Sequence, residues 1–329
     1  MRKFIVALAA TMAVALIGAP LPAEANTKMR CSHQLPPAHH IAQVIERWAE
    51  EVRTASTGEL DVQIFGADSL VRANQNITSV AKGDIECAFS LNFQWGRTLE
   101  LMNVTVAPFA FGDLEIWRKW PKSEPAAFLE GKLLEKGVRN VVWMFQTNTS
   151  VFTSKGRFLV KPDDFKGVKI RGLNPQFDAG LTALGATTSA LPGSEVYQAL
   201  ATGVLDAAIT DVAAAVSRKY FEVQDHFVVL PVLSAYLHGY VNPKWYDGLS
   251  AKAKEALASA GLKAAAWAVE ASEKAGSAAP DQLRERGVKV HVATPEENKA
   301  LEKIMRPAFD ARFGEDADSK KLIALISKM

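Results

Sequence analysis

The feature that most constrains the fold is a regular alternation of two kinds of segment. Short apolar segments, as at residues 28–32 and 60–65, read as strands, and between them residues 40–56 place Ile41, Val44, Ile45, Trp48 and Val52 at helical spacing. Strands that alternate with amphipathic helices are typical of α/β domains. The sequence therefore predicts an α/β fold with mixed, mostly parallel sheets.

The alternation occurs in two sets, which predicts two lobes. Strands are expected in the first set at 28–32, 60–65 and 85–91, and in the second at 138–145, 151–154, 168–171, 187–191 and 205–210. After two returning strands, residues 250–283 are rich in alanine, lysine and glutamate and predict one or two long helices, followed by a short strand at 289–292 and a terminal helix from Pro295. We expect 26–148 to form the first part of lobe 1, 149–237 to form lobe 2, and 238–329 to return and complete lobe 1.

Residues 1–25 have the order of a cleaved secretory signal peptide. Arg2 and Lys3 precede an apolar run, which ends in Ala23-Glu24-Ala25. Glycine and proline interrupt the run before it reaches the roughly 20 residues that a membrane span needs. We expect export, cleavage before Asn26, and a mature chain of 304 of the 329 residues, a length typical of two lobes.

Charge and cysteine content exclude some classes of partner. The 38 basic and 36 acidic side chains are spread along the chain, which does not favour nucleic acid or an anionic membrane as a partner. Cys31 and Cys87 both lie in predicted strands, where each could be a buried reduced thiol or the two could form one disulfide. The sequence leaves these alternatives open.

The chain lacks the common motifs of catalysis and cofactor binding. Gly-x-Ser-x-Gly, the phosphate-binding Gly-x-x-x-x-Gly-Lys, His-Glu-x-x-His and Cys-x-x-Cys are all missing. His33, His39 and His40 are close in sequence, but adjacent residues at a helix start are expected to point in different directions. We therefore expect no metal, no cofactor and no enzyme.

Arg171 ends a short strand in the segment GVKIRGLNP, just before a turn. The carboxyl ends of strands are where α/β sheets place ligand crevices, and a guanidinium holds a carboxylate with two parallel hydrogen bonds. The alternative is an ion pair with an Asp or Glu of the chain. The first interpretation predicts a carboxylate clamp.

Several segments resemble one family over nearly the whole mature chain. They are DDFKGVKIRGLN, LTALGATTSALPGSEVYQALATGVLDAAITD, KYFEVQDHF, GELDVQIFGADSL, VAKGDIECAFS and APFAFGD, and together they resemble the solute-binding proteins of TRAP transporters, the DctP family. The resemblance implies a two-lobed periplasmic binding protein fold, similar to type II, with the ligand cleft between the lobes. It also implies a receptor in the periplasm of a Gram-negative bacterium, which closes on a small organic acid and delivers it to the TRAP membrane permease subunits.

By the same resemblance, Arg171 is the carboxylate-binding residue. The other ligand-binding positions it implies or leaves open are Gln34, Gln94, Trp95, Ser150, Asn174, Thr210, Asp211 and Tyr236. Trp95 and Tyr236 could instead be core aromatics, Gln34 and Asn174 could be turn residues, and Asp211 could cap a helix.

Three departures from the family pattern leave the ligand undefined. Ser150 stands where sialic-acid receptors of the family have a second arginine, and Thr210 and Asp211 end the segment that replaces the usual Gly-Gln-Glu-Asn-Pro. Gly193 stands where an aromatic residue is usual, and we expect its small size to enlarge the pocket. A receptor of an ATP-driven importer and a secreted enzyme are the alternative functions.

Overall fold

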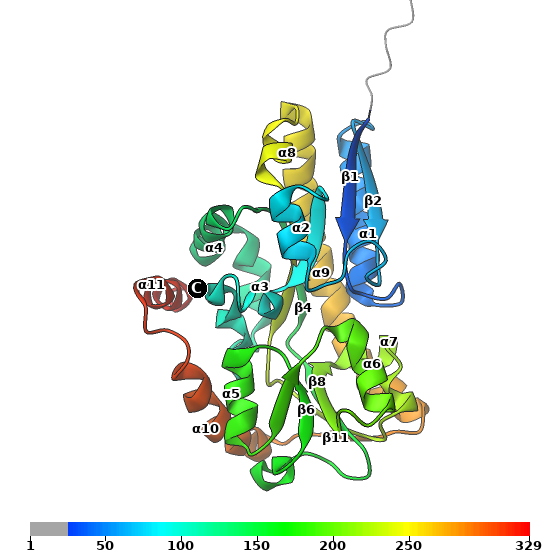
Figure 1. The fold of residues 1–329 in the computed structure, drawn as a ribbon, viewed down its shortest axis with the longest axis vertical. Helices are drawn as coiled ribbons and strands as arrows, with labels where there is room; N and C mark the ends of the chain where they lie inside the picture. Colours follow the sequence, from blue (N-terminus) through cyan, green and yellow to red (C-terminus); the bar gives the residue numbers. More distant parts are fainter. Residues whose placement is uncertain (1–25) are drawn as a thin grey trace, which may run out of the picture.

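Residues 26–329, which the computed structural model describes, form two α/β lobes with one sheet each (Figure 1). The first sheet has the order β2-β1-β3-β10-β4 and the second β11-β9-β5-β8-β6-β7. The proposed signal peptide, 1–25, lies outside the described residues. No helix in the described part is both long and apolar enough to cross a membrane.

The strands and helices fall close to the predicted segments. The strands are β1 (Thr27–Ser32), β2 (Leu60–Phe65), β3 (Cys87–Leu91), β4 (Arg139–Thr147), β5 (Ser150–Ser154), β6 (Lys169–Gly172), β7 (Thr187–Ala190), β8 (Ala207–Asp211), β9 (His226–Leu230), β10 (Ala235–Val241) and β11 (Lys289–Val292). The helices are α1 (His40–Ala55), α2 (Asn76–Lys82), α3 (Leu114–Lys119), α4 (Glu124–Glu135), α5 (Pro175–Ala183), α6 (Gly193–Ala201), α7 (Val212–Ser217), α8 (Pro243–Asp247), α9 (Ala251–Glu285), α10 (Pro295–Asp310) and α11 (Ala317–Ile326).

Both sheets are mixed, which confirms the predicted fold class. β1 pairs in parallel with β2 and β3, and β6 pairs in parallel with β7 and β8. The antiparallel members are β10 in the first sheet and β5 in the second. These two strands directly follow the points where the chain passes from one lobe to the other.

The lobes are joined at several places. The chain crosses from β4 to β5 through residues 148–149 and returns from β9 to β10 through residues 231–234. The single long helix α9 runs along both lobes, packing against α1 and β4 in the first lobe and against α7 and β11 in the second (Figure 1). At Gly261 the helix approaches β4 so closely that a Cβ would lie 2.4 Å from the carbonyl oxygen of Val141.

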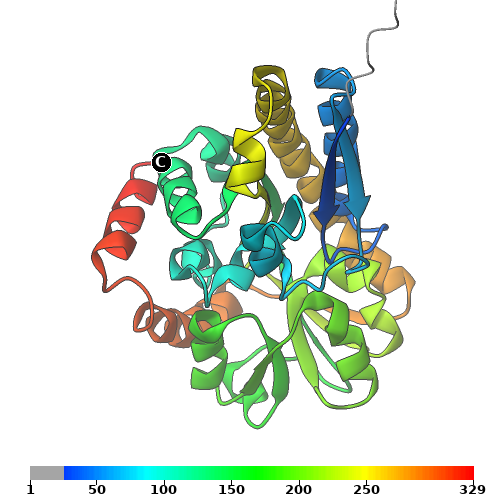
Figure 2. The same ribbon diagram turned by 45° about the horizontal axis from the view of Figure 1, so that its top comes forward.

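The C-terminal part contributes to both lobes, which corrects the assignment of 238–329 to lobe 1. β11 pairs with β9 at the edge of the second sheet, and α10 packs on α5 of the second lobe. α11 then returns to α4 of the first lobe, beside which the C-terminus lies (Figure 2). Cys31 and Cys87 lie opposite each other on the neighbouring strands β1 and β3. Both are buried free thiols, so the disulfide alternative is not observed.

Candidate functional site

A small enclosed cavity lies between the lobes. It has a volume of about 30 Å³ and is lined from the second lobe by the ends of β6 and β8 and the start of α6, and from the first lobe by residues that follow β1 and β3. Its polar lining residues are Gln34, Gln146, Thr147, Arg171, Thr210, Asp211 and Arg218. Because this space admits little more than a water molecule, the lobes must part before a ligand can enter.

Arg171 lies in the wall of this cavity at the end of β6. Its side chain is buried, with only 3% of the residue exposed. Nε and Nη2 donate to the carbonyl oxygen of Leu191 at 3.1 and 3.0 Å, and Nη1 donates to that of Ile209 at 2.7 Å. A guanidinium has five N–H groups, so one remains on each terminal nitrogen.

No carboxylate of the described chain pairs with Arg171 within 4.0 Å. Burial lowers the pKa of Arg171 to about 10, which leaves the group charged at neutral pH. Asp178 is a carboxylate whose charge raises the pKa of Arg171, and burial raises the pKa of Asp178 itself to about 6 despite the attraction of Arg171. Asp178 instead accepts the backbone N–H of Leu173 at 2.7 Å, so the internal ion pair considered for Arg171 is not observed.

The aromatic residue that faces Arg171 is Phe93, which the sequence did not indicate. The guanidinium carbon lies 5.7 Å from the centre of the Phe93 ring, within cation–π range. Trp95 is fully buried in the first lobe, with its ring 5.3 Å from those of His238 and Tyr240. Gln94 accepts the backbone N–H of Leu91 at 2.8 Å, and neither Gln94 nor Trp95 lines the cavity.

Three further candidates also point away from the cavity. Tyr236 lies among the aromatic rings of the first lobe, and its hydroxyl contacts Met102 Sδ at 3.5 Å. Ser150 donates to the carbonyl of Leu233 at 3.3 Å. Asn174 caps α5 by accepting the N–H of Phe177 at 2.9 Å. The core and turn interpretations describe the environments of Tyr236 and Asn174.

Gln34, Thr210 and Asp211 do line the cavity. Gln34 joins the two lobes, because its side-chain oxygen accepts the backbone N–H of Gly193 at 2.9 Å. Asp211 caps α7 by accepting the N–H of Ala213 at 2.9 Å, and its other oxygen accepts a bond from Gln146 at 3.3 Å. Burial raises the pKa of Asp211.

His39 and His40 meet Asp211 in a buried cluster, contrary to the expectation that the two histidines diverge. Their rings stack with centres 4.4 Å apart, and His39 Nε2 lies 3.5 Å from Asp211 Oδ2. His39 Nδ1 accepts the N–H of Ile41, so the proton of the neutral ring is on Nε2, facing Asp211. His40 Nε2 lies 3.2 Å from the carbonyl of Gln146 and must donate to it. The ligand atoms of the three side chains lie within 4.8 Å of one another, and His40 Nδ1 has no hydrogen-bond partner. As placed, however, the neutral ring of His39 has no free lone pair for a metal ion, because Nδ1 accepts a hydrogen bond and Nε2 carries the proton.

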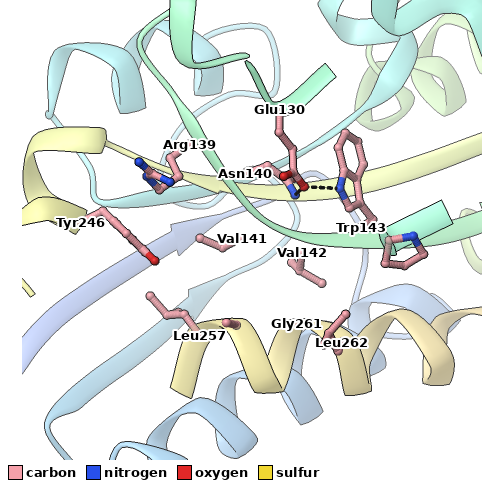
Figure 3. Close-up of a pocket in the computed structure, with 12 residues that line it drawn as sticks. Glu130, Arg139, Asn140, Val141, Val142, Trp143, Tyr246, Leu257, Gly261 and Leu262 are labelled. Carbon is pink, nitrogen blue, oxygen red and sulfur yellow. Dashed lines mark hydrogen bonds between the residues drawn. The ribbon is translucent and has the colours of Figure 1, made fainter. Parts of the chain in front are cut away.

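A larger hollow of about 260 Å³ lies within the first lobe between β4 and α9 (Figure 3). Its carboxylate, Glu130, accepts hydrogen bonds from Trp143 Nε1 at 2.7 Å and from Asn140 at 3.0 Å. Its cation, Arg139, stacks over Tyr246 at 4.6 Å. This hollow is lined by one lobe alone, so closure of the lobes would not bury a ligand there.

Two lobes joined by crossing segments, with a buried cation in the cavity between them, define a two-lobed binding protein. The family model of the bacterial extracellular solute-binding proteins, family 7 (DctP), matches residues 31–316, and the chain belongs to this family. This confirms the family that the sequence motifs resemble.

Relatives cover much or nearly all of the chain. A solute-binding protein of Albidiferax ferrireducens is 30% identical over 204 residues, 60% of each chain. The C4-dicarboxylate-binding periplasmic protein DctP of Rhodobacter capsulatus is 27% identical over 319 residues, 94% of this chain and 93% of that one. Among solved structures, a TRAP periplasmic solute-binding protein from Rhodoferax ferrireducens with bound malonate is 25% identical, with a TM-score of 0.84 over 91% of this chain and 97% of that one.

Proposed function

We propose that this chain is the periplasmic receptor of a TRAP transporter, which captures a small organic carboxylate between its lobes and delivers it to the membrane permease subunits. Export by the signal peptide at 1–25 and residence in the periplasm of a Gram-negative bacterium are part of the proposal. The relatives described above support it, since they are solute-binding proteins and one is a TRAP receptor with bound malonate.

The observation that carries the proposal is that Arg171 is a buried cation and that no carboxylate among the described residues forms an ion pair with it. A buried cation without an ion-pair partner is costly, and a ligand carboxylate would supply the missing charge. One N–H on each terminal nitrogen is left by the three bonds to backbone carbonyls. A guanidinium can form a bidentate bond to one carboxylate with two parallel N–H groups, and the bonds to the carbonyls hold this guanidinium in place.

Closure follows from the position of the ligand between the lobes. Arg171 belongs to the second lobe, whereas Phe93, Gln34 and Gln146 belong to the first. A ligand that contacts both sides binds the closed form better than the open one and shifts the population towards it. The permease would recognise this closed shape.

The alternatives are weaker. A receptor for an ATP-driven importer would have a similar two-lobed fold, but the family and the Rhodoferax relative favour a TRAP permease. For an enzyme, the cavity would need a nucleophile or a free general base. The carboxylate in its lining, Asp211, is engaged by Ala213 and Gln146.

A thermal-shift screen of organic acids with two variants tests the proposal. A ligand at about 100 times its Kd should stabilise the protein by about 2.7 kcal/mol. Arg171→Ala should abolish this shift, and Arg171→Lys should reduce it strongly, because an ammonium group cannot form the bidentate bond.

The matched control is Lys169→Ala, which removes a positive charge from the exposed part of the same strand and should leave the shift unchanged. Protein unfolded and refolded before the assay excludes a shift masked by a carried-over ligand. The proposal is wrong if the shift survives in Arg171→Ala, or if only neutral or cationic solutes stabilise the wild type.

A further inference from the structure

A second arginine, Arg218, lies in the cavity wall beside Gly193. Arg218 ends α7, and its guanidinium rests directly against Gly193. A Cβ on Gly193 would lie 3.0 Å from Nη2, 3.1 Å from Cζ and 3.3 Å from Nε. The missing side chain does not enlarge the pocket, as the sequence had suggested, because the guanidinium fills that space.

Arg218 has hydrogen-bonding capacity left over. Its one hydrogen bond runs from Nη2 to the carbonyl of Gln34, at 3.1 Å, across the two lobes. Among residues 26–329, no Asp or Glu oxygen comes within the 4.0 Å of an ion pair with it. Burial lowers the pKa of Arg218, and its charge in turn lowers that of Arg171, so the two cations lie near each other in a poorly solvated space.

Asp68 and Asp211 raise the pKa of Arg218 through their charge, but neither of them forms an ion pair with Arg218 or Arg171. Both oxygens of Asp211 face protein donors: Oδ1 accepts from Ala213, and Oδ2 accepts from Gln146 and lies 3.5 Å from His39 Nε2. The cavity therefore presents two guanidinium groups with N–H groups to spare. Leu35, Leu91 and Leu173 supply apolar wall between the polar groups.

Building on the proposed function, we propose that Arg218 is a second anion-binding residue of the cavity, seated by Gly193, and that it selects ligands with a second carboxylate. Arg171 holds one carboxylate and Arg218 the other, with a short apolar chain between them. Arg218 also links this second carboxylate to closure, because the same guanidinium bonds to Gln34 of the opposite lobe.

The test compares each dicarboxylate from malonate to adipate with its own monoamide, by calorimetry on refolded wild type and variants. The monoamide has nearly the same shape and retains one carboxylate for Arg171. We expect the wild type to prefer the best dicarboxylate over its monoamide by about 30-fold or more, the range for a buried charged pair. In Arg218→Gln this ratio should fall to near one, with the monoamide still bound.

The ratio of the two affinities separates recognition of the second carboxylate from closure of the lobes. Loss of the bond to Gln34 should weaken the binding of the dicarboxylate and of its monoamide to the same extent. Gly193→Ala should lower the ratio too, since its Cβ displaces the guanidinium. Lys219→Gln is the matched control: it removes the neighbouring charge, whose side chain is 67% exposed, and should keep the ratio.

Each outcome decides the matter. If dicarboxylates bind and need Arg171, but Arg218→Gln keeps the wild-type ratio, this proposal is overturned and the proposed function stands. The same holds if the wild type does not distinguish a dicarboxylate from its monoamide. If no carboxylate binds the wild type, or if binding survives Arg171→Ala, the proposed function itself fails.

Discussion

Three buried histidines and the half-buried His40 make the protein sensitive to acid at the level of single residues. Burial lowers the pKa to about 4 for His33 and His40 and to about 3 for His39 and His238. In the unfolded chain these groups titrate near 6.5. Because the folded-state pKa values lie below the unfolded one, the stability they contribute is present above about pH 6.5 and is lost as the pH falls through the folded values.

We therefore expect the free energy of unfolding to drop steeply between pH 6 and 4, by about 1.4 kcal/mol per pH unit for each histidine that stays neutral in the fold. Urea unfolding at a series of pH values measures this slope. A flat or rising free energy on acidification would contradict the neutral, buried state of these rings.

Asp178 acts in the opposite direction. Its pKa is raised by burial, to about 6, from an ordinary value of 3.8. The contribution of Asp178 to the free energy of unfolding is therefore fully present below about pH 3.8 and is lost as the pH rises through 6. Asp178→Asn should steepen the acid loss between pH 6 and 4 by up to about 1.4 kcal/mol per pH unit, and the exposed control Asp163→Asn should leave it unchanged in the same titration.

The sequence placed only part of the site, for reasons that lie in local geometry. Arg171 is predicted from its place at the end of a strand, Gln34 from the resemblance, and Thr210 and Asp211 from a departure from the family pattern. All four line the cavity. Phe93 was missed because residues 92–95 form a tight 3-10 turn, which directs Phe93 to the cavity and Trp95 to the core. A search two positions to either side of Trp95 would have included it.

Arg218 carried no recognisable signal. It lies 25 positions after Gly193, the residue that makes room for it, and only the folded chain brings the two together. Glycine at position 193, where an aromatic residue is usual, suggests a larger pocket. The space is instead occupied by the guanidinium of Arg218, so an aromatic surface is replaced by a charged group.

At the scale of elements, periodicity predicted which segments are strands and helices but not all their neighbours. The strand at 289–292 was expected, yet its partner is β9 of the second lobe. Four residues carry too little pattern to select one sheet over another. The long helix α9 was clearer, because alanine spacing over 35 residues leaves no comparable alternative.

Two helical glycines should respond oppositely to alanine. Gly261→Ala would place a Cβ 2.4 Å from the backbone oxygen of Val141, so α9 must move off β4. We expect a loss of about 1–3 kcal/mol. At Gly131 in α4 a Cβ would meet nothing within 4 Å, so alanine should stabilise by about 0.5–1 kcal/mol.

Chemical unfolding of both variants beside the wild type measures these changes. Equal effects at the two positions would show that helix propensity alone decides them, and that the close approach of α9 to β4 is not as described. Circular dichroism before unfolding checks that both variants retain the native helix content.

For the whole molecule, polar contacts across the cleft hold the lobes together. Ser194 donates to Asp68 at 2.6 Å, Gly193 donates to Gln34 at 2.9 Å, and Asn103 bonds to Gln176 at 3.0 Å. Each of these contacts joins a residue of one lobe directly to a residue of the other. They set how far the closed form is populated before binding.

Ser194→Ala should shift the unliganded protein towards the open form, since the exposed bond it removes contributes about 0.5–1.5 kcal/mol. The radius of gyration from small-angle scattering should increase, and ligand affinity should fall by the population lost. Ser277→Ala, which removes an exposed serine within α9, should change neither. An unchanged radius for Ser194→Ala would mean that this contact does not hold the lobes.

The course of α9 sets a mechanical limit on how the lobes can separate. Because α9 packs on both lobes, it must bend when they separate, and the energy of bending grows with the angle between the lobes. Pro280 lacks the N–H that would bond to the carbonyl of Gly276, and a Cβ on Gly276 would lie 3.7 Å from Thr149, in the crossing between β4 and β5. The helix therefore lacks a backbone hydrogen bond beside the crossing segment 148–149. Bending of α9 at that place would let the lobes separate while both ends of the helix stay packed on their own lobes.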